Sequence, residues 1–396
     1  MGRRMGRRKG RRKGRRGRRM GRRMGRRKGR RRGAYGRPTR ENSGGSEATM
    51  NEFQEGVFFG MKAADYHLIP ALSSSGIKWL SVSAEDFWAR TPWLNPLAES
   101  VSTSALSAGK AYHARIVEGP VAFASRFCAQ LDKADYPDAL VTADDLRNAL
   151  REAGLKTGGN KDELTDRLLA HDPGAPIWAQ MQENYHIANA GKVMLAQGLI
   201  DDIEIAAAMI EKHPVIGKCF RGGHPEVVIC WVDPETGVPL KAMLDYLKIG
   251  AIIDLKSFSN PQERSIERAI YAAVEYRKYY VQAAHYMDAA SQIGDLVHRG
   301  LIFTANGEFN GESQWIAKVG SSPKEFVFVF QQTGIAKVTR CVRLPDTMVM
   351  GIGKAICRYG IEKFKAYREL YGDSQWLEIG EVADLDDSGF TAFLGR

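Results

Sequence analysis

The stretch that most constrains this chain is PLKAMLDYLKIGAIIDLKS, which occupies residues 239–257. Its pattern predicts two strands joined by a tight turn at Lys248-Ile249-Gly250. The second strand is apolar from Ala251 until it ends in Asp, Leu and Lys, which is typical of a strand buried on both faces. Charged side chains at the end of such a strand require partners or a metal ion, because burying a charge is costly. The hairpin therefore predicts a sheet core with a polar site at one end.

The polar residues of this hairpin that could act together are Asp245, Asp254 and Lys256. Neighbouring antiparallel strands lie about 5 Å apart, so two carboxylates on them can bind one divalent ion. Oxygen ligands favour a hard cation, Mg²⁺ or Mn²⁺. Residues 254 and 256 share a face, so Lys256 would lie beside the ion, where it could orient or deprotonate a water or stabilise a phosphate. Such a site suits phosphodiester hydrolysis. Asp-x-Lys alone, however, favours a simpler explanation, an ion pair at a strand end.

The charge of the chain is divided unevenly. Residues 1–49 contain 22 of the 57 Lys and Arg residues and two of the 46 Asp and Glu residues, and they begin with a Gly-Arg-Arg repeat. We expect this segment to be disordered, because it cannot form a core. It reads either as a phosphate-binding tail or as translated upstream sequence before a natural start at Met50. The remaining chain has 35 basic and 44 acidic residues, a net charge of −9, so nucleic-acid binding there must depend on local sites.

The five cysteines are scattered and show neither CxxC spacing nor a disulfide framework; they are Cys128, Cys219, Cys230, Cys341 and Cys357. This favours a reducing cytosol. No apolar run has the length of a membrane span, and the charged N-terminus lacks the apolar region of a secretory signal. The expected location is the cytoplasm, without a membrane partner.

Three further segments are expected to carry polar residues of interest. A helix over 103–119 would place Gly109 and His113 four apart on one face, and the glycine would permit close backbone approach. A strand beginning at Glu226 would precede the hairpin. A single long helix over 263–293 would place Gln282 on an apolar stripe, where a glutamine needs a polar partner.

The segment 135–172 is expected to form a separate helical insert. It reads as helix, glycine-containing turn and helix, and it resembles the SAP module, a small DNA-binding unit. The matching positions include leucines at 146, 150, 155, 164 and 168. An ordinary helical hairpin with a charged outer face is the alternative. If the resemblance holds, Lys156, Lys161 and Arg167 would contact DNA.

Four motifs in order resemble the PD-(D/E)XK nuclease superfamily in its RecB-like branch. They are GKAYHARIVEGP, LDYL, IIDLKS and QAAHY, and the nearest likeness is to the exodeoxyribonuclease VIII (RecE-type) nuclease domain. Tyr66-His67 with the following serines, and the spacing of Gly109, His113 and Glu118, also fit that group. The resemblance implies an α/β fold with a restriction-endonuclease-like core, a mixed central sheet flanked by helices. It assigns residues 50–134 and 173–396 to the nuclease domain.

The resemblance also implies roles. His113, Asp245 and Asp254 would be metal ligands for Mg²⁺ or Mn²⁺, and Glu226 would be an extra acidic residue on the preceding strand. Catalysis would use Lys256 with both aspartates, and Gln282 and Tyr286 would hold the site and the nearby DNA backbone. The last acidic residue is Asp254, where many members have Glu.

The expected activity is metal-dependent exonuclease digestion of duplex DNA ends, in the 5′ to 3′ direction, leaving single-stranded tails for recombination. The expected partners are DNA ends, a single-strand annealing protein and further copies of the chain, in a bacterial or phage-infected cell. Two alternatives stay open. One is a non-enzymatic DNA-binding protein that uses the insert and the basic tail, and the other is an endonuclease or nickase of the same fold.

Overall fold

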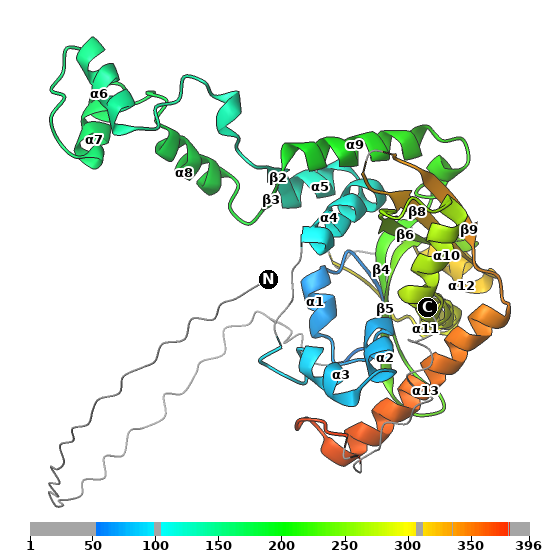
Figure 1. Cartoon of the computed structure of the whole chain (residues 1–396). Coiled ribbons are helices and arrows are strands. Elements are labelled where there is room, and N and C mark those ends of the chain that lie inside the picture. The colour runs from blue at the N-terminus through cyan, green and yellow to red at the C-terminus, as the bar shows by residue number, and fades with distance from the viewer. Residues whose placement is uncertain (1–52, 99–103, 306–311, 335, 379, 381–396) are drawn as a thin grey trace, which may run out of the picture. The chain divides into compact units, whose positions relative to one another are not determined.

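The computed structural model describes residues 53–98, 104–305, 312–334, 336–378 and 380. It contains a seven-stranded mixed sheet in the order β7-β1-β4-β5-β6-β8-β9 (Figure 1). The pairs β1–β7 and β6–β8 are parallel, and the other neighbours are antiparallel. The strands are β1 (Gly56–Phe59), β4 (His224–Val232), β5 (Pro239–Leu247), β6 (Ala251–Phe258), β7 (Ile302–Thr304), β8 (Glu325–Gln332) and β9 (Thr339–Arg343).

Helices cover both faces of this sheet. The long helices α11 and α13 pack on each other and contribute to the main core with α2, α3 and α12. The helices of this group are α2 (Ser74–Leu80), α3 (Ala84–Arg90), α10 (Ile266–Tyr276), α11 (Tyr279–His298), α12 (Glu312–Ser321) and α13 (Met348–Tyr371). Elements that contribute to the other face include α1 (Ala63–Leu68), α4 (Ser104–His113), a π-helical turn (Ala114–Glu118), α5 (Pro120–Arg126) and α9 (Gln197–Lys212).

The strands β6 and β8 show why their sequences are apolar throughout. In β8, Phe326 and Phe328 belong to the main core, whereas Val327 and Val329 belong to a second cluster on the opposite face. The same alternation separates neighbouring isoleucines in β6. Residues that alternate between two buried faces leave no polar side, so the run is continuously apolar. The fold is therefore the α/β class with a mixed, helix-flanked sheet that the sequence predicts.

The expected single helix over 263–293 is wrong. The chain forms α10 and α11, and the break lies at Lys278, whose backbone is left-handed at φ 49° and ψ 47°. No proline or glycine marks the position, so sequence pattern alone could not find it. At the break the chain contacts a distant segment, where the Lys278 ammonium donates to the Ser81 hydroxyl at 3.2 Å.

The expected helix over 103–119 also differs in its last turn. After α4 ends at His113, the chain widens into the π-helical turn, and the N–H of Gly119 bonds to the carbonyl of Ala114, five residues earlier. Single π turns inside helices are frequent at functional sites. This turn changes which side chains share a face with His113.

The helical hairpin predicted as an insert consists of α6 (Ala143–Glu152) and α7 (Lys161–His171). It has its own core of leucines closed by Ile177, and each helix starts with a capping box. The chain leaves and returns through a short parallel pair, β2 (Phe127–Ala129) and β3 (Val193–Leu195), with α8 (Trp178–Ala188) between the hairpin and β3.

All five cysteines are free, and the sulfur atoms of Cys219 and Cys341 lie 4.0 Å apart. Across the parts of the chain that the structure describes, no helix is long and apolar enough to cross a membrane. The arginine-rich segment 1–49 lies outside the described residues.

Candidate active site

Three acidic residues lie in a row across three neighbouring strands. The β4–β5 register, in which Val227 pairs with Leu244, places Glu226 opposite Asp245. The β5–β6 register, continued by one residue, places Asp245 opposite Asp254. Neighbouring strands are about 5 Å apart, so the row concentrates negative charge in a small volume.

The backbone is distorted at this row. Glu226 has a φ of 51°, a left-handed conformation that costs free energy in a residue with a side chain. Within the described strands, the β5–β6 ladder ends at Tyr246 and Ile253, so the two strands part at the carboxylates. The freed N–H of Leu255 donates to the Asp245 carboxylate at 2.9 Å. Distortions of this kind occur next to active sites.

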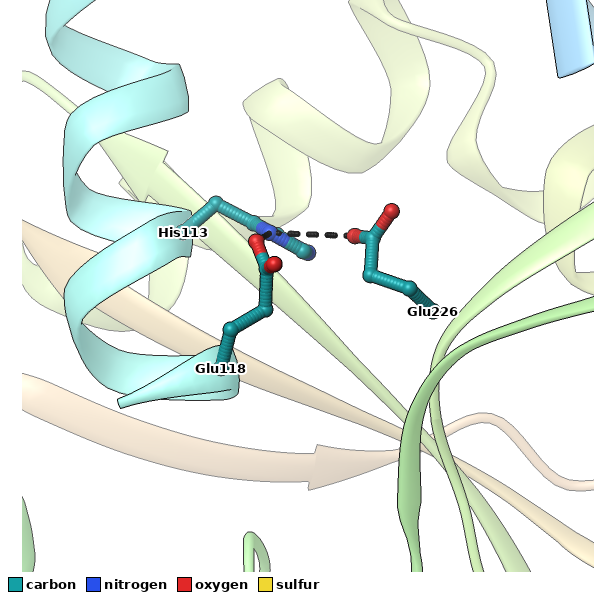
Figure 2. A group of neighbouring side chains, drawn as sticks. All are labelled: His113, Glu118 and Glu226. Atoms are coloured by element: carbon teal, nitrogen blue, oxygen red, sulfur yellow. Dashed lines mark ion pairs between the residues drawn. The ribbon is translucent and has the colours of Figure 1, made fainter. Parts of the chain in front are cut away.

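His113 lies between the carboxylates of several elements. Its Nε2 is 3.3 Å from Asp245 Oδ2, and its Nδ1 is 3.3 Å from Glu226 Oε1 and 3.6 Å from Glu118 Oε1. Figure 2 shows the side chains of His113, Glu118 and Glu226 converging from the helix and from the strand. Burial opposes protonation of the imidazole, but Asp245, Glu118 and Glu226 outweigh it and raise the pKa of His113 to about 10.

The π turn explains why Glu118 joins this group. In a regular α-helix, residues five apart point in different directions, because each residue turns the chain by about 100°. A π turn bonds residues five apart and so brings Glu118 back over His113. Arg126 of α5 forms an ion pair with the same oxygen of Glu118, Oε1, that lies near His113. The sequence analysis noted the spacing of Glu118 but gave it no role, since the π turn is not visible in the sequence.

Asp254 and Lys256 are fixed together on one face of β6. Asp254 is fully buried and forms an ion pair with the Lys256 ammonium. Burial, reinforced by the charge of Asp245, raises the pKa of Asp254 to about 7. Burial would lower the pKa of Lys256, but Asp254 and Asp245 reverse this and raise it. The lysine is therefore held as an ammonium ion.

Helix α11 supports this pair from the opposite layer. Gln282 finds the polar partner that its apolar surroundings require, since its amide nitrogen donates to Asp254 Oδ1 at 2.9 Å. Tyr286, one turn later, is buried and interacts with Gln282, and burial raises the pKa of its hydroxyl. The ring of Tyr279 lies under the Lys256 ammonium, 4.9 Å from its centroid.

The charges of the site do not balance without a cation. Four carboxylates converge, from Glu118, Glu226, Asp245 and Asp254, and Lys256 and Arg126 provide two positive charges. With all four carboxylates ionised, the sum is −1 when His113 is protonated and −2 when it is neutral, the form that a metal ligand requires. One ligand atom each of His113, Glu118 and Glu226 lies within 4.8 Å of the others, a spacing that could hold a metal ion. Asp254 Oδ2 is buried and makes no hydrogen bond to the described residues beyond its ion pair. Oxygen and imidazole ligands with surplus negative charge fit a divalent cation.

Residues 73–317 match the model of the PDDEXK-like domain of unknown function (DUF3799).

The chain belongs to this PDDEXK-like family.

The matched residues contain the whole row of carboxylates, Lys256 and Gln282, and membership supports assignment as a nuclease. A crystal structure described as "Putative exonuclease" from Eubacterium rectale is similar over 82% of this chain and 94% of that chain, at 14% identity and a TM-score of 0.41. Among curated proteins, the sequence has no significant match.

The sequence analysis expected Gly109 to permit close backbone approach, but the structure does not require it. A Cβ atom at this position would meet the Ser257 hydroxyl at 3.6 Å, an ordinary contact. The glycine lies where α4 passes β6, and space for a methyl group is available there.

Two of the three cations predicted to contact DNA are used inside the α6–α7 hairpin. Arg167 donates to the carbonyls of Lys156 and Gly158 at 2.7 and 2.9 Å, and Lys161 donates to the Val141 carbonyl at 2.7 Å. These bonds close the hairpin, whereas the side chain of Lys156 is exposed. DNA contact by this hairpin stays a prediction.

Proposed function

We propose that this protein is a divalent-metal-dependent DNA exonuclease, which hydrolyses phosphodiester bonds from the ends of duplex DNA. The observation that carries the proposal is the row of Glu226, Asp245 and Asp254 with the Lys256 ammonium fixed beside it. A row of carboxylates alone would serve a structural ion, but a lysine held at its edge adds a group that can face a phosphate.

The metal would be Mg²⁺ or Mn²⁺. His113, Glu118, Glu226 and Asp245 are the side chains that would hold it, with Asp254 at the edge of the set. When bound, such an ion polarises the phosphate and lowers the pKa of a bound water. Loading requires His113 to lose its proton, because a metal ligand must be neutral imidazole.

The protein residues then complete the reaction. The oxygen of a water molecule attacks phosphorus, one P–O ester bond breaks, and the products are a phosphate monoester and a hydroxyl group, which receives a proton. Lys256, kept charged by Asp254, would stabilise the negative charge that develops on the phosphate or orient the water. Gln282 holds Asp254 in place through its amide, so it is a positioning residue.

The direction of digestion and the biological role extend the same proposal. The RecE-type likeness suggests digestion from 5′ to 3′, single-stranded tails for an annealing partner, and a homo-oligomer. Labelling one strand at its 5′ or 3′ end and following which label is released first tests the direction.

The deciding experiment compares linear duplex DNA with a covalently closed circle of the same sequence, in Mg²⁺, Mn²⁺ or a chelator. We expect wild-type protein to release nucleotides from the linear duplex only, and only with a metal. Asp254→Asn should remove this activity, whereas Lys365→Met, at an exposed position on α13, should retain it. Cutting of the circle would replace the exonuclease with an endonuclease, and the absence of release by wild type would overturn the proposal.

A further inference from the structure

A group of basic side chains lies beside the carboxylate row but is not used by it. Lys78 lies on α2, which packs on α11. Its charge interacts with those of Lys256 and Asp254 in the site and with those of Arg277 and Lys278. Arg277 and Lys278 form the junction between α10 and α11. The cluster therefore adjoins the catalytic lysine.

Ser81, at the end of α2, links Lys78 and Lys278. The Ser81 hydroxyl accepts from the Lys278 ammonium at 3.2 Å and donates to the carbonyl of Lys78 at 2.7 Å. This link ties α2 to the α10–α11 junction. Lys278 keeps a left-handed backbone, a conformation that persists in such a residue only when its surroundings hold it.

The cluster has more positive charge than its surroundings balance, since Asp254, the carboxylate whose charge acts on Lys78, is already paired with Lys256. Among the described residues, no carboxylate forms an ion pair with Lys78, Arg277 or Lys278. Lys78 is half-buried, and burial together with the charge of Lys256 lowers its pKa to about 8. Gathering unpaired positive charges is unfavourable, so their presence beside a site for a negatively charged polymer points to an anion as the missing partner.

An exposed aromatic ring extends the cluster outward. The Arg277 guanidinium lies 5.4 Å from the centroid of the Tyr276 ring, and the Tyr276 side chain is 82% exposed. Rings next to cations are the combination used to bind single-stranded nucleic acid, because bases stack on the rings and phosphates face the cations.

We propose that Lys78, Arg277 and Lys278 bind a phosphate group of the DNA strand, next to the phosphodiester that is cleaved. The inference rests on the proposed function, since it assumes that DNA enters the site. The phosphate could be the terminal phosphate of the strand or an internal phosphodiester. Binding one phosphate here would fix how the strand enters the site.

The test measures DNA affinity of the full chain by fluorescence anisotropy at several salt concentrations. The variants are Lys78→Met, which keeps the apolar stem, and Arg277→Ala, whose exposed position makes misfolding a minor concern. Lys78→Arg restores the charge, and Lys365→Met is the matched control. The N-terminal segment is present in every protein, so its contribution cancels in the comparison.

We expect each neutral variant to bind about tenfold more weakly, and the slope of log Kd against log salt to fall by about one. Lys78→Arg should recover the wild-type slope. In steady-state cleavage, KM should rise while kcat stays within about twofold, because a lost phosphate contact weakens ground state and transition state alike.

Three duplexes distinguish the source of the phosphate: one with 5′-phosphates, one with 3′-phosphates and one with hydroxyl ends. A terminal site predicts that wild type prefers one phosphorylated duplex and that Lys78→Met loses this preference. An internal site predicts an equal loss for all three. Wild-type affinity and salt slope in both neutral variants would overturn the inference while leaving the proposed function intact. A wild type that binds through these cations but releases no nucleotides would overturn the proposed function alone.

Discussion

The two strands of the β5–β6 hairpin each carry a lysine that is enclosed by protein, and the pKa values of the two lysines shift in opposite directions. Lys241, near the start of β5, is 4% exposed, and its ammonium donates to the carbonyls of Tyr66 and Ile69 at 2.9 and 2.7 Å. Lys256, near the end of β6, faces a carboxylate and an aromatic ring. Both lie on one hairpin and both are surrounded by protein.

The two lysines differ in the charge of the groups around them. Lys241 meets neutral groups at the end of α1, the backbone carbonyls and the Tyr66 ring, 4.9 Å from its ammonium, and burial lowers its pKa to about 8. Lys256 meets Asp254 and Asp245, which raise its pKa despite burial. The first lysine caps a helix and fastens the N-terminal segment to the sheet, whereas the second completes a charged site. Burial of a lysine is therefore not by itself a sign of catalysis, and the charge of its neighbours decides.

The largest expected difference between the two lysines is in the rate of DNA cleavage. Lys256→Met should reduce the rate of nucleotide release by about 100-fold or more, because it removes a fixed positive charge beside the phosphate. Lys241→Met, measured at a temperature where both variants are folded, should keep the rate close to that of wild type. Equal losses in the two variants would show that the distinction between the lysines is wrong.

Stability should show the reverse order. Lys241→Met removes the ammonium that donates to the buried carbonyls of Tyr66 and Ile69 and leaves each carbonyl with only a backbone N–H donor, so it should lower the free energy of unfolding by about 3 kcal/mol. Denaturant unfolding followed by circular dichroism measures this. An unchanged midpoint would mean that the backbone donors suffice and that Lys241 does not fasten the segment.

A smaller effect concerns the metal. Glu118→Gln removes a charge from the cluster while keeping its shape, and we expect about tenfold more Mg²⁺ to be needed for half-maximal activity. Mn²⁺ affinity measured by calorimetry should fall in parallel. Glu362→Gln, at an exposed position on α13, provides the control. If Glu118→Gln and its control require the same metal concentration, the π turn has no role in metal binding.

The smallest effect is on the pH dependence of stability. The pKa of Lys241 falls from its ordinary value of 10.5 to about 8 on folding. Between these values the unfolded chain binds more protons than the folded one, so stability rises with pH. From pH 7 to pH 9, wild type should gain about 1 kcal/mol relative to Lys241→Met, in which no group titrates at this position. A constant difference between the two proteins across this range would contradict the lowered pKa.

Much of the sheet and part of the site could be predicted from the sequence. The strand burial, the turn at Lys248-Ile249-Gly250 and the shared face of Asp254 and Lys256 follow from local periodicity, which each short segment carries by itself. The need of Gln282 for a polar partner followed from its place on an apolar stripe, and the structure supplies Asp254.

Other features depended on contacts between distant segments. The left-handed backbone at Glu226 and Lys278 has no glycine to announce it. The π turn that brings Glu118 to His113 replaces a helix turn that its sequence fits equally well. The role of Lys241 could not be predicted, because the carbonyls at the end of α1 that accept from its ammonium lie far from β5 in the sequence.

By itself, the sequence determined the mixed sheet, the order of the motifs and which strands bring carboxylates. Only the tertiary structure decided that three carboxylates share one histidine, that Lys256 belongs to the charged site whereas Lys241 is structural, and that a basic cluster adjoins them. The physical reason is the separation along the chain between the residues that cause each feature. Periodicity acts over a few residues of one segment, whereas pKa values, ion pairs and strained backbone are set by groups that the chain brings together from far apart.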